Sequence, residues 1–338
     1  MANFLQLIPD NRREALDVAA ARSGRPPHLL EKDVWVVWAL DVLFQSSFGK
    51  HLVFKGGTSL SKAFRIIRRF SEDIDITWDI RALAPELAGE GAEPLPQNPS
   101  QEKRWTKEIR KRLPLQITEQ IVPAIHAALA AQNLEADLSQ EGERLYIRYP
   151  ALTAGTGYVR PEILLEFGAR STGEPSDVRT VVADAAEFLP GLVFPTASPR
   201  TMRPERTFWE KATAMHVYCA QGVFRGGNRF SRHWHDITHL DLAGFVDVAI
   251  KDPELGRAVA RHKAVFFQEK NADGSVIDYA SAVTGQLQLI PRGEALRILE
   301  TDYAQMIEDR LLPEDEADSF RRLLERCQEV QDKANRSR

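Results

Sequence analysis

The stretch from Val53 to Ile76, VFKGGTSLSKAFRIIRRFSEDIDI, decides the expected fold. Its pattern predicts a short strand, a turn at Gly56 and Gly57, a helix over Thr58–Ile67 capped by its first residue, and a second strand. Glycines let the backbone approach an anion closely, and the first turn of a helix directs unpaired amides toward the same place. We therefore interpret the turn as a cradle for phosphate. The spacing is not that of a P-loop.

The second strand, Asp73 to Trp78, alternates acidic and apolar residues. Alternate residues of a strand share a face, so Asp73 and Asp75 point together while their isoleucine neighbours point into the core. Paired carboxylates repel one another unless a cation is bound, and Mg²⁺ (or Mn²⁺) takes oxygen ligands of this kind. The pattern predicts a metal site at these two residues. A glycine pair or an acidic pair alone is usually a turn or a solvated strand face, and the combination in this order indicates chemistry.

A third carboxylate is expected from a neighbouring strand. Glu166 lies between apolar residues in the strand-like segment EILLEF, 162–167, and Glu162 is an alternative on the same face. Glu166 would either complete the metal site or accept the proton of the attacking hydroxyl. A lone strand carboxylate can also be purely structural.

The rest of the chain predicts an α+β fold with a soft boundary near residue 200. We expect a mixed sheet with helices over 1–200 and an all-helical domain over 201–338 that completes an active-site cleft. Periodicity predicts helices at 10–22, 27–46 and about 101–131, strands at 51–55, 145–149 and 178–182, a loop at 81–100, and helices from residue 203 onward.

Composition limits the class of protein. The chain has 338 residues, of which 43% are hydrophobic, enough for a folded core. Its net charge of −4 argues against a surface that coats nucleic acid as a whole. Cys219 and Cys327 form neither a metal cluster nor a disulfide framework, and no signal peptide or membrane-length apolar run is expected. These features predict a cytoplasmic protein that is not in a membrane.

Basic residues nevertheless gather in three places. The groups are Arg65, Arg68 and Arg69; Lys103, Arg104, Lys107, Arg110, Lys111 and Arg112; and Arg225, Arg229 and Arg232. In the second group several cations share one helix face while Trp105 and Ile109 share another, which suits an RNA backbone or, alternatively, a solvated face. The third group is the next candidate for RNA. We expect Arg68 and Arg69 to contact RNA phosphate or nucleotide rather than to pack inside.

These motifs resemble a known family. The order hGG[TS]…[DE]hDh with a later hEh strand resembles the polymerase-β-like nucleotidyltransferases. FKGGTSLSKAF…RFSEDIDI and the upstream LLEKDVWVVWAL are similar to the AbiEii/AbiGii toxin branch. Two later segments, ERTFWEKATAMH and RHWHDITHL, match in character and place Lys211 and Asp236 at the family's lysine and aspartate positions. The last segment departs from the family's RDLYDL by its additional histidines.

The resemblance implies a toxin of a toxin–antitoxin or phage-defence system that transfers a nucleotide from an NTP to RNA, with the 3′ end of tRNA as acceptor. It also implies a cognate antitoxin. Lys211 would neutralise phosphate charge in the transition state. The candidate catalytic residues are Asp73, Asp75, Glu166, Lys211 and Asp236, and the candidate nucleotide-binding residues are Lys55, Gly56, Gly57, Thr58, Ser59, Arg69 and Ser71. Ser71 is also explained as a turn residue or cap, and phosphorylation there would add negative charge beside the carboxylates.

Other functions stay open at this point. The segment HDITH, 235–239, places His235 and His239 on one helix face beside Asp236, as a metal-dependent phosphohydrolase or protease would. The glutamate of H-E-x-x-H is missing, and no third ligand is evident nearby. A noncatalytic RNA- or partner-binding module on the same fold is a second alternative. A protein hydroxyl or a small drug is an alternative acceptor.

Overall fold

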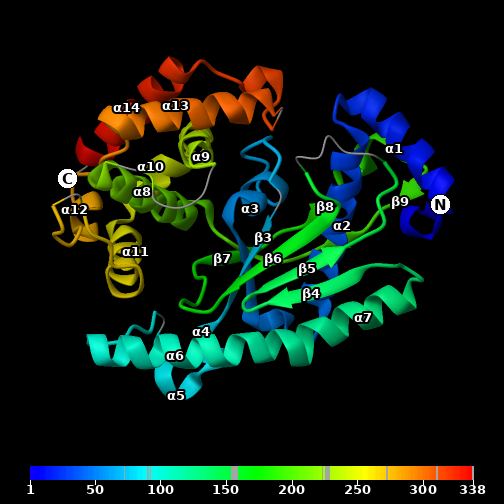
Figure 1. Cartoon of the computed structure of the whole chain (residues 1–338), viewed down its shortest axis with the longest axis horizontal. Coiled ribbons are helices and arrows are strands. Elements are labelled where there is room, and N and C mark those ends of the chain that lie inside the picture. The colour runs from blue at the N-terminus through cyan, green and yellow to red at the C-terminus, as the bar shows by residue number, and fades with distance from the viewer. Residues whose placement is uncertain are drawn as a thin grey trace. The chain divides into compact units, whose positions relative to one another are not determined.

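The computed structural model describes residues 1–71, 73–89, 91, 93–153, 159–222, 224, 229–271, 273–309 and 311–336. The chain divides into a sheet unit (Met1–Ala63, Glu72–Ala92 and Arg104–Met202) and a helical unit (Phe64–Ser71, Glu93–Lys103 and Arg203–Arg338). A mixed sheet flanked by helices characterises the first, and helices build the second (Figure 1). The α+β class expected from the sequence is confirmed. No helix in the described part of the chain has the length and apolar character to span a membrane.

The sheet unit contains the strands of the protein. They are β1 (Ala2–Asn3), β2 (Leu52–Lys55), β3 (Asp73–Trp78), β4 (Asp137–Glu141), β5 (Arg144–Arg148), β6 (Glu162–Gly168), β7 (Ser176–Val178), β8 (Val181–Val182), β9 (Leu192–Val193), β10 (Thr196–Ala197) and β11 (Arg200–Met202). Seven of them form one sheet in the order β4-β5-β6-β3-β2-β11-β7. The β3–β6 and β2–β11 pairs are parallel, and the other neighbours in this sheet are antiparallel.

Helices surround this sheet within the same unit. They are η1 (Phe4–Gln6), α1 (Pro9–Ser23), α2 (Pro27–Gln45), η2 (Gly49–His51), α3 (Gly56–Lys62), α4 (Ile80–Leu83), α5 (Pro85–Ala88), α6 (Pro99–Gln116, whose first residues belong to the helical unit), the π-helical η3 (Ile117–Ile121), α7 (Val122–Ala131) and η4 (Asp184–Phe188). The helix α2 packs against β6 and α7 (Figure 1). Its Trp35 stacks on Tyr149 with ring centroids 5.0 Å apart. Burial of this aromatic pair anchors α2 to the core.

Alternation along the central strands separates core from surface. Ile74 and Ile76 of β3 are fully buried, as are Ile163 and Leu165 of β6. The acidic residues of these strands, Asp73, Asp75, Glu162 and Glu166, are only partly buried and lie on the opposite face. Since side chains alternate along a strand, one face of the sheet is apolar core and the other carries the charges.

The helical unit is built from helices after residue 203. They are α8 (Pro204–Gln221), α9 (Ser231–Leu242), α10 (Phe245–Lys251), α11 (Pro253–Phe266), α12 (Tyr279–Ala282), α13 (Gly293–Glu308), η5 (Glu314–Glu316) and α14 (Phe320–Arg336). The helix α9 packs against α8, α10, α13 and α14. Its buried Trp234 donates its indole N–H to the carbonyl of Leu289 at 2.7 Å. This central position of α9 explains why its polar residues are buried.

The structure corrects several sequence expectations. The helix expected over Thr58–Ile67 is α3, which begins two residues earlier and ends at Lys62. Thr58 therefore lies inside the helix and does not cap it. Arg65, at φ 53°, adopts a left-handed conformation that no continuing helix permits. The strand expected at 178–182 is divided between β7 and β8, β4 was not anticipated, and the expected loop at 81–100 contains α4 and α5.

Candidate active site

A row of charged residues crosses four neighbouring strands of the sheet. Lys55 of β2 is the partner of Asp75 on β3, Asp75 is the partner of Glu166 on β6, and Glu166 is the partner of Arg144 on β5. Paired residues of adjacent strands point to the same side of a sheet, so these four share one face. Asp73 shares that face two positions earlier on β3. The face therefore presents three carboxylates flanked by two cations, and we call Asp73, Asp75 and Glu166 the carboxylate face.

The turn beside this face requires glycine at its first position. Gly56 has φ +79°, and a Cβ added there would collide with the Asp75 carboxylate oxygen Oδ2. Any other residue would therefore be strained in its backbone and would displace the Asp75 side chain. The Asp75 carboxylate occupies the space that a side chain at position 56 would need, so backbone from the beginning of α3 lies beside Asp75.

Two hydroxyls of α3 hold this arrangement together. Thr58 Oγ1 donates to the backbone carbonyl of Asp73 at 2.5 Å, and Ser59 Oγ donates to the carbonyl of Gly56 at 2.8 Å. Both side chains are buried. Their hydroxyl protons are therefore used within the protein, where they join the turn to the first residue of β3. Phosphate binding at this turn would depend on backbone amides and on Lys55.

The two glutamates of β6 have equivalent partners. Glu166 accepts from Arg144 Nε at 2.7 Å, and Glu162 accepts from Arg148 Nε at 3.0 Å. Both pairs bridge β5 and β6. Only Glu166 is opposite an acidic residue of β3, because Glu162 lies beyond the β3–β6 register. The register thus distinguishes two glutamates that the sequence left as alternatives.

The donor set of the carboxylate face fits a hard divalent cation. It offers carboxylate oxygens on adjacent strands, and Mg²⁺ and Mn²⁺ favour such ligands over nitrogen or sulfur. The absent side chain at Gly56 also leaves backbone rather than a side chain against Asp75. Residue type and the shared face therefore suit such a metal, while the ligand atoms of the three carboxylates do not all lie within 4.8 Å of one another.

Other predicted residues lie in the helical unit and form a buried cation–carboxylate cluster. Arg69 binds both oxygens of Asp236 through Nε at 2.6 Å and Nη2 at 2.8 Å. Lys211 Nζ on α8 lies 2.9 Å from Asp236 Oδ2. All three residues are buried, and Asp236 is fully so. The expectation that Arg69 would not pack inside is wrong, because its guanidinium neutralises a buried carboxylate. We call these three residues the Asp236 cluster.

Charge partners decide the ionisation of Asp236. Burial alone would raise its pKa, but Arg69 and Lys211 outweigh burial and hold the pKa well below its usual range. Asp236 is therefore a carboxylate at neutral pH. Because its oxygens already bind two cations, the His235–Asp236 doublet does not offer a pair of metal ligands of the phosphohydrolase kind.

The remaining predicted residues have simpler surroundings. Ser71 precedes β3, which begins at Asp73, so the strand-face argument does not extend to it. Arg68 forms an exposed ion pair with Asp315. Arg225 lies outside the described residues. The predicted turn or cap interpretation of Ser71 therefore remains the simpler one.

The helix α6, which carries the predicted basic surface, has one buried apolar side and one exposed basic side. Trp105, Ile109 and Leu113 of α6 are buried. Five cations are exposed, namely Lys103, Arg104, Lys107, Arg110 and Lys111. Arg112 differs because it pairs with Glu86 and Glu108. One side of α6 is therefore anchored in the core, and the other presents positive charge to solvent.

Two charged residues were not anticipated from the sequence, namely Arg144 and Glu316. Arg144 neutralises Glu166, and strand alternation in LYIRY would have placed it on the same face had the strand been started one residue earlier. Glu316 approaches the histidines of α9 from η5, about eighty positions later in the chain. Its acidic neighbours gave no periodic signal, so no pattern in the sequence could have identified it.

Comparison with known proteins agrees with these motifs. A family model described as "Nucleotidyl transferase AbiEii toxin, Type IV TA system" matches residues 38–326. A solved structure similar to the chain is MenT4, nucleotidyltransferase toxin Rv2826c from Mycobacterium tuberculosis H37Rv, with 16% sequence identity, a TM-score of 0.41, and coverage of 94% of this chain and 98% of that one. No curated protein matches the chain. The family match includes both the carboxylate face and the Asp236 cluster.

Proposed function

The chain belongs to the AbiEii family of nucleotidyltransferase toxins, and from this premise we propose that it transfers a nucleotide from an NTP to RNA in a metal-dependent reaction at the carboxylate face. The acceptor in this proposal is the 3′ end of tRNA. A cognate antitoxin restrains the reaction, in keeping with the type IV toxin–antitoxin system named for the family.

One observation carries the proposal. Asp73, Asp75 and Glu166 share one sheet face, and the register places Asp75 directly opposite Glu166. Lys55 and Arg144 place two positive charges beside these three carboxylates, which leaves a formal excess of one negative charge that a divalent cation can balance. Mg²⁺ or Mn²⁺ held by these residues would neutralise triphosphate charge and activate the attacking hydroxyl. The chain's own contribution is to hold the carboxylates in a fixed register.

The other candidate residues have separate roles in the proposal. Backbone amides of the Gly56–Gly57 turn bind phosphate oxygens, while Thr58 and Ser59 hold the turn in place through their hydrogen bonds. The helix α3 has only seven residues, so the amides matter more than the helix dipole. Lys55, the strand partner of Asp75, contributes positive charge beside the phosphates. Lys211 stabilises charge that develops in the transition state.

RNA binds the exposed cations of α6 in this proposal. The whole chain carries a net charge of −4, so attraction of RNA requires a local basic surface. The buried side of α6 fixes the helix, and its exposed lysines and arginines are positioned to contact successive phosphates. These contacts are electrostatic and would not specify a sequence.

Nucleotide labelling tests the activity. The full chain is incubated with each labelled NTP in turn, Mg²⁺ and total cellular RNA, and the RNA is then separated by size. We expect one or few NTPs to label tRNA-sized molecules, and EDTA to abolish the label. Label on protein rather than RNA, or transfer that EDTA does not affect, would contradict the acceptor or the metal requirement respectively.

A matched pair of glutamates tests the catalytic face. Glu166→Gln and Glu162→Gln each remove one charge from β6 and one cross-strand ion pair. We expect Glu166→Gln to reduce the transfer rate by about 100-fold or more, and Glu162→Gln to change it little. Equal effects of the two variants would remove Glu166 from the site.

Charge reversal on α6 tests the RNA surface. Lys107, Arg110 and Lys111 changed together to Glu should weaken RNA binding, and each lost phosphate contact should flatten the log–log salt slope by about 0.7 to 0.9. The control reverses the exposed Arg321, Arg322 and Arg336 of α14, which changes net charge equally. If both triple variants weaken RNA binding alike, net charge rather than α6 is responsible.

A further inference from the structure

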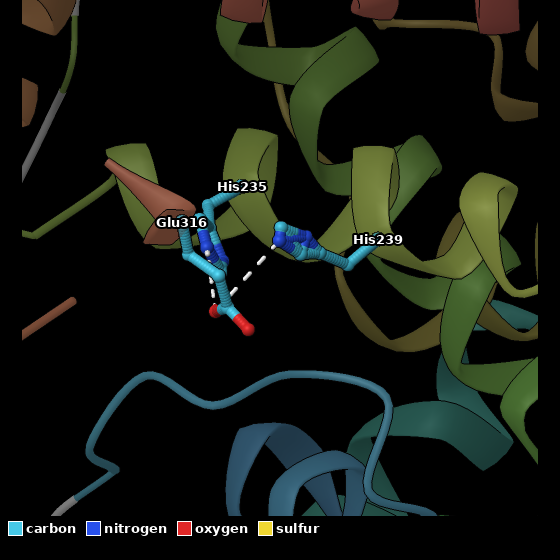
Figure 2. Close-up of side chains that lie close together, drawn as sticks. All are labelled: His235, His239 and Glu316. Atoms are coloured by element: carbon cyan, nitrogen blue, oxygen red, sulfur yellow. Dashed lines mark ion pairs between the residues drawn. The ribbon is translucent and has the colours of Figure 1, made fainter. Parts of the chain in front are cut away.

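Two histidines and a glutamate converge in the helical unit. His235 and His239 lie one turn apart on α9, and Glu316 approaches them from the end of η5 (Figure 2). The Glu316 oxygen Oε2 lies 3.6 Å from His235 Nε2 and 3.7 Å from His239 Nε2. One ligand atom from each residue falls within 4.8 Å of the other two. Both distances are longer than a hydrogen bond and lie in the range of an ion pair, as the dashed lines in Figure 2 mark.

The buried ring of His235 has an unpartnered nitrogen aimed at this point. His235 is 1% exposed, and within the described part of the chain its Nε2 atom has no hydrogen-bond partner. Its other nitrogen, Nδ1, faces the Asp236 oxygen Oδ1 at 3.5 Å. A proton on Nδ1, beside this oxygen, would leave the Nε2 lone pair available to a cation. A carboxylate behind a histidine is the usual support of a metal-binding imidazole.

The third ligand is also fixed in position. Glu316 Oε2 accepts the backbone N–H of Arg68 at 3.2 Å. The imidazole rings of His235 and His239 have centroids 4.1 Å apart at an interplanar angle of 42°. Nitrogens of two rings and a carboxylate oxygen thus converge, and all three are groups that can ligate a metal ion.

We propose that His235, His239 and Glu316 bind a zinc-class transition metal ion. Two ligand atoms about 2.1 Å from a tetrahedral zinc ion lie about 3.4 Å apart, within a few tenths of an ångström of the two histidine–glutamate distances. Two imidazoles and one carboxylate form a ligand set that suits Zn²⁺ and does not suit Mg²⁺, which prefers oxygen in octahedral geometry. Water fills the fourth position. The site shares no residue with the carboxylate face.

The metal would fasten η5 to α9 and stiffen the Asp236 cluster. His235 connects the two, because one of its nitrogens binds the ion and the other contacts Asp236. Bound metal therefore stabilises the fold and orients Asp236 between Arg69 and Lys211. The role is positional, and the inference does not depend on the identity of the transferred nucleotide.

Zinc binding by the full chain tests the proposal. The protein is stripped with EDTA, dialysed into excess Mg²⁺ to saturate the carboxylate face, and titrated with zinc sulfate by calorimetry. We expect one zinc ion per chain and a rise in melting temperature. His239→Gln and Glu316→Gln should each weaken zinc binding by more than about 100-fold, while His126→Gln, an exposed histidine on α7, should bind as wild type.

A second measurement tests the site in the case that a variant does not fold. If circular dichroism shows that either variant is unfolded, Co²⁺ replaces zinc in the wild-type chain, still in excess Mg²⁺. A strong visible absorption from tetrahedral Co²⁺ supports the site. A wild-type chain that binds neither ion, or folded His239→Gln and Glu316→Gln variants that both bind zinc as tightly as wild type, overturns the proposal.

Discussion

The carboxylate face and the Asp236 cluster both contain predicted catalytic acids, but these acids differ in their burial and in their charged partners. Asp73, Asp75 and Glu166 are partly buried acids on adjacent strands, two of them directly opposite each other. Asp236 is fully buried and is bound by Arg69 and Lys211. In the first arrangement three acids share a face with two cations, Lys55 and Arg144. The second neutralises its one acid within the protein, so that acid supports the fold at least as much as any chemistry.

Removing the buried acid should give the largest stability effect. Asp236→Asn leaves Arg69 and Lys211 buried with one neutral partner, and we expect the free energy of unfolding to fall by about 3–5 kcal/mol. Asp73→Asn, which removes an acid from the carboxylate face, should leave stability unchanged or slightly higher because it relieves repulsion. Guanidinium unfolding of both variants measures the contrast. Equal destabilisation would mean that the two regions do not differ in the way described.

Removing Lys211 should affect catalysis more than substrate binding. In the proposed role its charge matters most as phosphate charge redistributes, so we expect Lys211→Ala to lower kcat by about 100-fold with a smaller change in KM. Destabilisation should be milder than in Asp236→Asn, because Arg69 still pairs with Asp236. Lys251→Ala, an exposed lysine on α10, is the control. A change confined to KM would indicate a uniform binding role instead.

Another buried acid extends the comparison to the pH dependence of stability. Glu31 of α2 is buried, and burial raises its pKa to about 7 despite backbone hydrogen bonds from Leu152 and Thr153 and the charge of Arg12. The unfolded chain loses this proton near the ordinary pKa of 4.5, so stability is full below that pH and declines as pH rises through about 7. Asp236, with a depressed pKa, contributes stability that is lost only in strong acid.

The smallest expected effect follows from Glu31. Glu31→Gln should remove the decline in stability between about pH 4.5 and 7 and raise the free energy of unfolding at pH 8 by about 1–3 kcal/mol. Glu14→Gln, an exposed change on α1, should keep the wild-type pH dependence. Denaturant unfolding at a series of pH values provides the measurement. A Glu31→Gln profile parallel to wild type would show that Glu31 is not protonated in the folded chain.

The carboxylate face could be predicted from sequence because its information is local. Alternation in Asp73–Trp78 and in 162–167 fixed the strands and their faces, and the glycine pair marked the turn. The structure adds the register, which selects Glu166 over Glu162 as the partner of Asp75. Register depends on pairing between distant segments, so alternation alone could not supply it.

The Asp236 cluster was only partly predictable because its partners are distant. Arg69 belonged to a basic run that suggested contact with RNA, yet a carboxylate 167 positions away binds it inside the helical unit. The early end of α3 at Lys62 was missed for the same reason. Helix propensity favoured a longer helix, but residues 64–71 belong to the helical unit. Local pattern cannot reveal a buried partner that comes from elsewhere in the chain.

Nucleotide transfer at the carboxylate face is the central proposal for this protein. The direct measurement is the rate of transfer of labelled nucleotide to RNA by Asp75→Asn, beside Asp177→Asn, which removes an exposed acid from β7 of the same sheet. We predict a loss of about 1,000-fold or more in Asp75→Asn with an unchanged melting temperature, and little loss in the control. Transfer by folded Asp75→Asn at nearly the wild-type rate would contradict the account.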